Sequence, residues 1–237
     1  MVSSSFLRQL FVVLVYVSSP VALAAAARKT ADLHTEPGPA ARKSPSEKAA
    51  GCRCVALTFD DGPDKRTTPR LLDILSREGV KATFYLVGSR IAGARGVVRE
   101  MRDEGHEIGN HSWDHRELTR LSPERVLQEI RSTDEAIEAA TGARPQTLRA
   151  PYGSLDRAVR KDFKRPFIAW DIDTLDWKYH SVSRITATVL SESRPGSIIL
   201  LHDIHRTTVD AVEGIIDGLR SRGFSFVTVS QLLHPKG

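Results

Sequence analysis

Two adjacent aspartates, Asp60 and Asp61, come at the end of a short apolar run over residues 55–59, which is typical of a buried strand. The Gly62-Pro63 pair follows them and prevents the strand from continuing. Two neighbouring carboxylates at the end of a core strand repel each other and resist desolvation, so a nearby cation or arginine would explain them. The alternative is an ordinary turn in which aspartate side chains bond their own backbone.

Residues 111–115 read His-Ser-Trp-Asp-His, which places His111 and His115 four positions apart. On one helical turn the two rings would lie on the same face and could chelate one ion. This spacing is weak evidence by itself, because surface helices produce it by chance. Two histidines with one of the two aspartates, and with positions left open for water and substrate, describe a catalytic metal site.

The metal that these ligand types predict is Zn²⁺, although cobalt or nickel could replace it because affinity alone discriminates poorly among such ions. Only one of Asp60 and Asp61 is needed as a ligand. The other would lie beside the attacking water, where a general base belongs.

Three more charged residues follow other strand-like runs. Arg149 could hold the general base ionised and in position, and the alternative for it is an ordinary surface ion pair. His202 ends the apolar run 197–201, where a buried structural histidine is the simpler interpretation. A nearby Asp176 would instead raise the pKa of His202 and suit it to act as a general acid.

Strand-like and helix-like patterns alternate along the chain from residue 55 onward, with short connections. The predicted helices cover residues 67–78, 91–104, 123–141 and about 209–219. The predicted strands cover residues 55–59, 82–86, 107–109, 147–148, 167–172, 197–201 and 224–227. This alternation predicts an α/β barrel or an open parallel sheet. Both folds place residues that follow strands at one edge, so the charged residues named above should meet there.

The chain resembles the polysaccharide deacetylases, carbohydrate esterase family four, which share the NodB-homology domain. Five motifs in order carry the resemblance: TFDDGP at 58–63, HSWDH at 111–115, RAPY at 149–152, DTLDW at 173–177 and LLH at 200–202. Each motif alone is loose, whereas all five in order are specific. The resemblance implies a distorted, incomplete (β/α) barrel of about seven parallel strands, and metal-dependent removal of N- or O-acetyl groups from a polysaccharide.

By the same resemblance, most of the motif residues have an expected role in catalysis. Asp60 would be the general base and His202 the general acid. Arg149 would orient Asp60, and Asp176 would tune His202. The metal ligands would be Asp61, His111 and His115.

The remaining motif residues would bind the reacting acetyl group. The backbone N–H of Tyr152 would help to bind the oxyanion, and Trp177 and Leu200 would line the acetyl pocket. The chain departs from the family between residues 153 and 166, where basic residues dominate and no clean apolar helix face is present. This difference concerns the wall of the groove, and therefore the substrate more than the chemistry.

We expect the substrate to contain N-acetylglucosamine, as peptidoglycan or chitin-type chains do, because His202 offers the proton that amide cleavage demands. The alternative on the same site is an acetylxylan esterase. A non-catalytic carbohydrate-binding protein would not need the acid, base and ligands that are all present. A metal phosphoesterase would need more carboxylates or a second metal.

The N-terminal residues differ in composition from the rest of the chain. Residues 1–27 combine an early arginine, an apolar run and small residues, which predicts a secretory signal, and residues 28–50 have the composition of a disordered linker. Residues 51–237 would form the catalytic domain. We expect a secreted or cell-envelope protein without stable membrane insertion after cleavage. An uncleaved signal that anchors the protein is the alternative, although the apolar stretch barely approaches the roughly 20 residues of a spanning helix.

Charge and cysteine content limit the partners and the chemistry. The net charge is +5, but residues 1–50 contain six basic and three acidic residues, so the remainder has 28 basic and 26 acidic residues. This near balance gives no support for nucleic-acid binding. Cys52 and Cys54 are the only cysteines and could pair in a tight loop, for which we predict no catalytic role. We expect the protein to be a monomer whose partner is its polysaccharide substrate.

Overall fold

The structure is a computed structural model that describes residues 52–154, 160, 161 and 163–234. The predicted signal segment, residues 1–27, and the predicted linker, residues 28–50, lie outside these residues. Part of the segment 153–166, where the chain departs from the family, also lies outside them. In the described part of the chain, no helix is long and apolar enough to cross a membrane.

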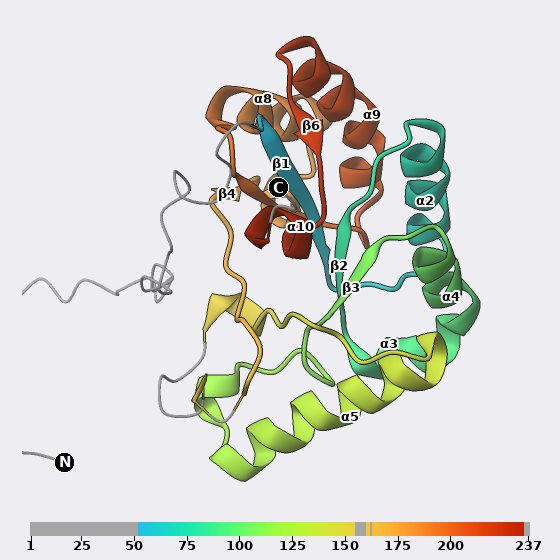
Figure 1. The fold of residues 1–237 in the computed structure, drawn as a ribbon, viewed down its shortest axis with the longest axis vertical. Coiled ribbons are helices and arrows are strands. Elements are labelled where there is room, and N and C mark those ends of the chain that lie inside the picture. Colours follow the sequence, from blue (N-terminus) through green and yellow to red (C-terminus); the bar gives the residue numbers. More distant parts are fainter. Residues whose placement is uncertain (1–51, 155–159, 162, 235–237) are drawn as a thin grey trace, which may run out of the picture. The chain divides into compact units, whose positions relative to one another are not determined.

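Six parallel strands form the sheet of the domain (Figure 1). They are β1 (Cys54–Asp60), β2 (Thr83–Leu86), β3 (Glu107–Asn110), β4 (Ile172–Asp173), β5 (Ile198–His202) and β6 (Ser225–Phe226). Hydrogen-bonded neighbours follow the order β3-β2-β1-β5-β4, and β6 pairs with the first residues of β1. The parallel sheet confirms the predicted α/β fold.

One of the seven predicted strands, at residues 147–148, is reduced to isolated bridges in the structure. Leu148 makes parallel bridges to Asn110 on one side and to Phe167 on the other. The strand predicted over 167–172 is split, because after this bridge the chain turns toward β5. There Asp171 exchanges two hydrogen bonds of 2.9 Å with the backbone of Ile198, one through its N–H and one through its carboxylate. The hydrogen bonding between neighbouring strands is therefore interrupted near Leu148, and the barrel is incomplete as expected.

The pairing of β1 with β5 decides which side chains share a face of the sheet. Thr58 pairs with Leu200, and Asp60 pairs with His202. Residues of a strand alternate between the two faces, so Leu57, Phe59 and their partners point the opposite way. The polar residues of β1 and β5 consequently lie together on the inner face, at the carboxyl ends of both strands.

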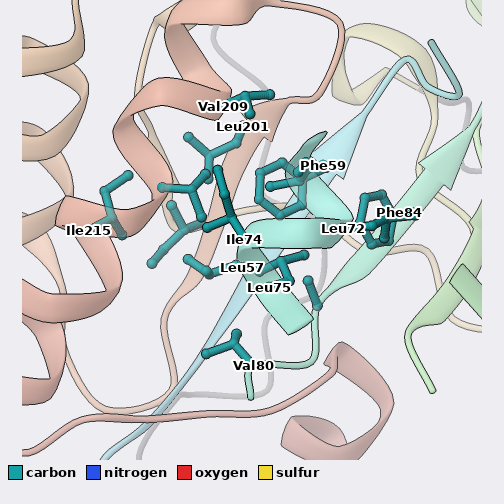
Figure 2. Close-up of a cluster of buried hydrophobic side chains, with 14 of the residues drawn as sticks. Leu57, Phe59, Leu72, Ile74, Leu75, Val80, Phe84, Leu201, Val209 and Ile215 are labelled. Carbon is teal, nitrogen blue, oxygen red and sulfur yellow. The ribbon is translucent and has the colours of Figure 1, made fainter. Parts of the chain in front are cut away.

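The outer face of the sheet carries the main hydrophobic core beneath the long helices (Figure 2). Leu57 and Phe59 of β1 pack there with Leu72 and Ile215. These helices are α2 (Thr67–Arg77), α4 (Arg95–Asp103), α5 (Pro123–Thr141), α8 (Val182–Glu192) and α9 (Arg206–Ser221). The burial of this outer cluster fixes the strands whose ends bear the polar residues.

The inner face is filled at its other end by a short C-terminal helix, α10 (Val229–Leu233). Val229 and Leu232 of α10 pack against Ala56 and Tyr85 in a second apolar cluster. The inner face is therefore covered by α10 beneath the polar residues, which lie at the carboxyl ends of the strands. The short helical segments are α3 (Gly88–Ile91), η1 (Ala92–Ala94), η2 (Leu118–Arg120), η3 (Pro151–Gly153) and α7 (Asp176–Tyr179).

Helix boundaries agree with the sequence patterns where capping residues mark them. The Ser122 side chain caps the start of α5, and Gly142 ends it in the left-handed conformation at φ 80°. The helix predicted over 91–104 is divided among α3, η1 and α4. Helices α8 and α10 were not predicted. A disulfide joins Cys52 and Cys54 at the amino end of β1, the end of the strand opposite Asp60.

Candidate active site

A buried ion pair holds the first of the two aspartates. Arg149 is 0% exposed, and its Nη1 lies 2.7 Å from Asp60 Oδ1 and 2.7 Å from Thr58 Oγ1. Its other nitrogens donate to the carbonyl oxygens of Ile168 and Ala169. Burial excludes the surface ion pair that was the alternative for Arg149. The arrangement fixes one oxygen of Asp60 and turns the other toward the site, where Oδ2 lies 3.7 Å from His111 Nε2.

The second aspartate faces both histidines of the 111–115 motif. Asp61 Oδ1 lies 3.4 Å from His111 Nε2 and 3.1 Å from His115 Nε2, and one ligand atom from each of the three residues lies within 4.8 Å of the others. His111 donates from Nδ1 to the carbonyl oxygen of Arg149 at 2.8 Å. In the neutral ring this tautomer leaves the Nε2 lone pair directed at the site.

This group fits a divalent cation. Asp61 Oδ1 is buried and has no hydrogen-bond partner among the described residues, although two ring nitrogens lie near it. Burial acts to raise the pKa of Asp61, but the neighbouring rings of His111 and His115 outweigh it and hold that pKa well below its usual range. A bound cation would supply the positive charge while leaving both rings neutral. Two imidazoles and one carboxylate, with room for further ligands, match the donor set of a catalytic zinc site.

The two histidines are not on a helical turn, so that part of the sequence prediction is wrong. Residues 111–115 form a loop after β3 in which Ser112 and His115 have positive φ angles of 65° and 60°. Asp61, the first residue after β1, also has a positive φ, of 72°. Non-glycine residues adopt such angles at a cost, and only where the surrounding structure fixes them. The conformation of this loop, and not helical spacing, brings the two rings together.

Two polar residues outside the motif fix this loop. Glu129 on α5 is 2% exposed, and its Oε2 accepts hydrogen bonds from the backbone N–H groups of Trp113 and Asp114 at 3.1 and 3.2 Å. Asn110 Oδ1 accepts from Ser112 N–H at 2.8 Å. Sequence reasoning missed Glu129. Its only signal was an acidic residue beside Val126 and Ile130 on the apolar face of a helix.

A second aspartate–histidine pair joins His202 at the end of β5 to Asp176 at the start of α7. His202 Nδ1 lies 2.8 Å from Asp176 Oδ1, and the His202 N–H and the Thr208 hydroxyl each donate to Asp176 Oδ2 at 2.7 Å. Trp177 N–H adds a bond of 3.0 Å to Oδ1. Burial opposes the charged imidazolium, but the hydrogen bond and negative charge of Asp176 outweigh it and raise the pKa of His202 to about 9. This histidine is therefore charged at neutral pH and can donate a proton.

The other three predicted residues also lie at this edge of the sheet. Tyr152 has a positive φ of 58° in η3, and its exposed ring contacts the His115 ring at a centroid distance of 4.9 Å. Leu200 is buried on the inner face beside Asp60 and His202, as its pairing with Thr58 requires. Trp177 is exposed near the start of α7. Their roles toward the oxyanion and the acetyl group stay predictions.

Asp203 is a further buried carboxyl group to which the motifs gave no role. It is 0% exposed, its Oδ2 accepts a bond of 2.5 Å from the Thr68 hydroxyl, and its Oδ1 has no partner among the described residues. Burial and the charge of Asp61 raise its pKa to about 7. Both oxygens lie directly against Gly62, where an added Cβ would come within 2.3 Å and 2.6 Å of them. Asp203 therefore packs beneath the turn that presents Asp61.

Known proteins with similar sequences include two that are named as deacetylases. The peptidoglycan-N-acetylglucosamine deacetylase PgdA of Listeria monocytogenes is 42% identical over 189 residues, which are 80% of this chain and 41% of that protein. The chitooligosaccharide deacetylase of Bradyrhizobium sp. is 37% identical over 201 residues, which are 77% of this chain and 92% of that protein. The chain thus spans about two fifths of the length of PgdA.

A solved structure and a family profile agree with these sequence matches. The family 4 acetyl xylan esterase of Clostridium thermocellum, determined in complex with a cobalt ion, superposes with a TM-score of 0.73 at 37% identity, over 76% of this chain and 89% of that one. The profile described as "Polysaccharide deacetylase" matches residues 47–165, which include three of the five motifs. The chain therefore belongs to the polysaccharide deacetylase family.

Proposed function

We propose that this protein is a metal-dependent hydrolase that removes acetyl groups from N-acetylglucosamine units of a polysaccharide. The observation that carries the proposal is the placement of Asp60 opposite His202 on β1 and β5, beside the group formed by Asp61 and the two histidines. A carboxylate held by an arginine and an imidazolium held by a carboxylate are the base and the acid that amide hydrolysis requires. Relatives named as deacetylases of peptidoglycan and chitooligosaccharides support the same activity.

Each charged residue has a separate task in the proposed reaction. Asp60, with one oxygen bound to Arg149, accepts a proton from the attacking water through its other oxygen. His202 gives its Nε2 proton to the departing amine while its Nδ1 stays bonded to Asp176. The backbone N–H of Tyr152 donates to the oxygen on which negative charge develops.

Asp61, His111 and His115 would hold the cation, for which we infer Zn²⁺ from the ligand types. When bound, a divalent ion lowers the pKa of a coordinated water and polarises a carbonyl group. The cobalt ion in the related acetyl xylan esterase supports a divalent metal in this fold and leaves the identity of the native metal to be measured.

We rank N-acetylglucosamine polymers above acetylated xylan. An amine is a poor leaving group unless it is protonated, whereas the alkoxide of an ester leaves more readily. The buried Asp176 holds His202 in the charged form, and this is of most use for amide cleavage. The predicted signal at residues 1–27 supports a polymer met outside the cytoplasm, so we also infer that the protein acts in the cell envelope or after secretion.

The Asp60→Asn variant tests the proposal. It should retain the bound metal and lower the rate of acetate release from chitooligosaccharides on the order of 10²- to 10⁴-fold, which is the usual contribution of a positioned base. Asp73→Asn, on the exposed face of α2, is the matched control and should keep full activity. Full activity in Asp60→Asn would refute the role of Asp60, and acetate release confined to acetylxylan would overturn the choice of substrate.

A further inference from the structure

A hollow of about 600 Å³ borders the proposed site on the side of the general acid. Its wall combines the start of α2 with the β5–α9 loop, the start of α9 and the residue that follows α7. Three arginines and two histidines line it, and we call it the basic hollow: Arg66, Arg70, Arg206, His180 and His205. None of these residues has a role in the reaction proposed above.

The arginines of the basic hollow outnumber the carboxylates near them. Asp210 lies 2.5 Å from Arg70 Nη2 and 3.6 Å from Arg206 Nε, so one carboxylate serves two guanidinium groups. Arg66 has no carboxylate oxygen within 4 Å of its guanidinium among the described residues. The nearby Asp64 directs its Oδ1 at the backbone N–H groups of Arg66 and Thr67. The hollow consequently presents an excess of positive charge to a ligand.

The basic hollow is joined to the general acid through its histidines. The His205 ring lies 6.1 Å from the His202 ring and 4.8 Å from the His180 ring, measured between centroids. Thr208, three residues after His205, donates to Asp176. A polysaccharide whose acetamido group reaches His202 therefore has part of its chain next to the hollow.

We propose that the basic hollow binds a carboxylate substituent of the polysaccharide, carried close to the sugar that is deacetylated. The inference rests on the proposed function and narrows its substrate. Guanidinium groups bind carboxylates with two parallel hydrogen bonds, and exposed arginines around a hollow can reorient to do so. Among polymers of N-acetylglucosamine, peptidoglycan carries carboxylates on its alternate sugars and on its peptides, whereas chitin-type chains are neutral.

The test compares a charged and a neutral form of the same substrate. The substrates are peptide-free peptidoglycan strands, the same strands after methyl esterification of their carboxylates, and chitooligosaccharides of matched length. The Arg66→Gln/Arg70→Gln double variant should raise KM on the charged strands on the order of tenfold, with kcat unchanged. On the esterified strands and the chitooligosaccharides it should match the wild-type protein within about twofold.

Arg77→Gln is the matched control. Arg77 lies on α2, as Arg70 does, and is 3.7 Å from Glu213 of α9, but it does not line the hollow. It should leave KM unchanged on all three substrates. Equal losses on charged and neutral substrates, no loss at all, or the same loss in Arg77→Gln would overturn the proposal.

Binding of the charged and esterified strands to the Asp60→Asn protein, with and without the two arginine substitutions, gives the same comparison without turnover. If the wild-type protein releases no acetate from any polymer, the proposed function fails. The binding data still decide on the basic hollow, because they require a tenfold preference for charged strands that the arginine substitutions abolish.

Discussion

The site contains two sets of aspartate and histidine that are alike in composition and opposite in environment. Asp176 is fully buried and accepts hydrogen bonds from the His202 ring and from three other donors. Asp61 is also largely buried, yet its Oδ1 has two ring nitrogens near it and no hydrogen bond among the described residues. The donors around each carboxylate, more than its partner histidine, therefore decide whether the pair suits a proton or a cation.

The orientation of each histidine follows the same division. The Nδ1 of His202 is bound to a carboxylate, which favours a charged ring with a proton to give. The Nδ1 of His111 donates to the Arg149 carbonyl oxygen, which fixes the tautomer and leaves Nε2 facing the site. Substitutions on the two sides should therefore fail in different ways.

Removing a charge from the proposed metal side should have the largest effect. Asp61→Asn replaces the only carboxylate among the three ligands, so the bound cation should be lost and acetate release should fall on the order of 10³-fold or more, since such an ion contributes several kcal/mol. Acetate release under added zinc measures it. An Asp61→Asn protein that turns over at the wild-type rate would remove the basis for calling this the metal side.

Removing a charge from the acid side should move a pH profile. The acid must be protonated, so activity should persist up to the pKa of His202, about 9, and decline above it. Asp176→Asn removes what raises this pKa, and the alkaline limb of kcat/KM should move down toward about 6.5, with roughly 30-fold less activity at about pH 8. Thr208→Val removes one hydrogen bond to Asp176 but no charge, and its limb should move little. An unmoved limb in Asp176→Asn would contradict the assignment of His202.

A third carboxyl group, that of Asp203, lies beneath the turn that connects Asp61 to α2, and its contact with this turn can be tested through stability. Gly62→Ala would force a Cβ to within 2.3 Å of Asp203 Oδ2, and overpacking of this kind should lower the free energy of unfolding by about 1–3 kcal/mol. Gly96→Ala, on α4 where nothing lies within 4 Å, should raise it by up to about 1 kcal/mol. Urea unfolding measures both. Equal stability of the two variants would show that the turn yields to the added methyl group.

The residues that follow strands were predictable because their position is a property of the fold. The apolar runs that end at Asp60 and His202 predicted two of the strands, and parallel strands bring their carboxyl ends to one edge. The structure also places the predicted metal ligands and the predicted acid pair together at that edge, and their roles stay predictions. The strand at 167–172 was predicted too long, and the polar Asp171 inside it was the local signal of the break.

The conformation of the histidine loop was not predictable, because a side chain of another element helps to fix it. The positive φ angles of Ser112 and His115 depend on support from Asn110 and on Glu129, which lies on another element. A His-x-x-x-His spacing suits both a helical turn and this loop, so the spacing alone favoured the commoner structure. The packing of Asp203 against Gly62 was not predictable either, since these two residues are far apart in the chain.

The most direct test of the two-sided site is the metal content of two variants purified under the same conditions. Asp61→Asn and Asp176→Asn each exchange one buried carboxylate for an amide of the same shape, so they differ only in the side that is altered. Elemental analysis should find one divalent ion per chain in Asp176→Asn, as in the wild-type protein, and a small fraction of that in Asp61→Asn. Full metal content in Asp61→Asn, or equal loss in both variants, would contradict the division of the site into a cation side and a proton side.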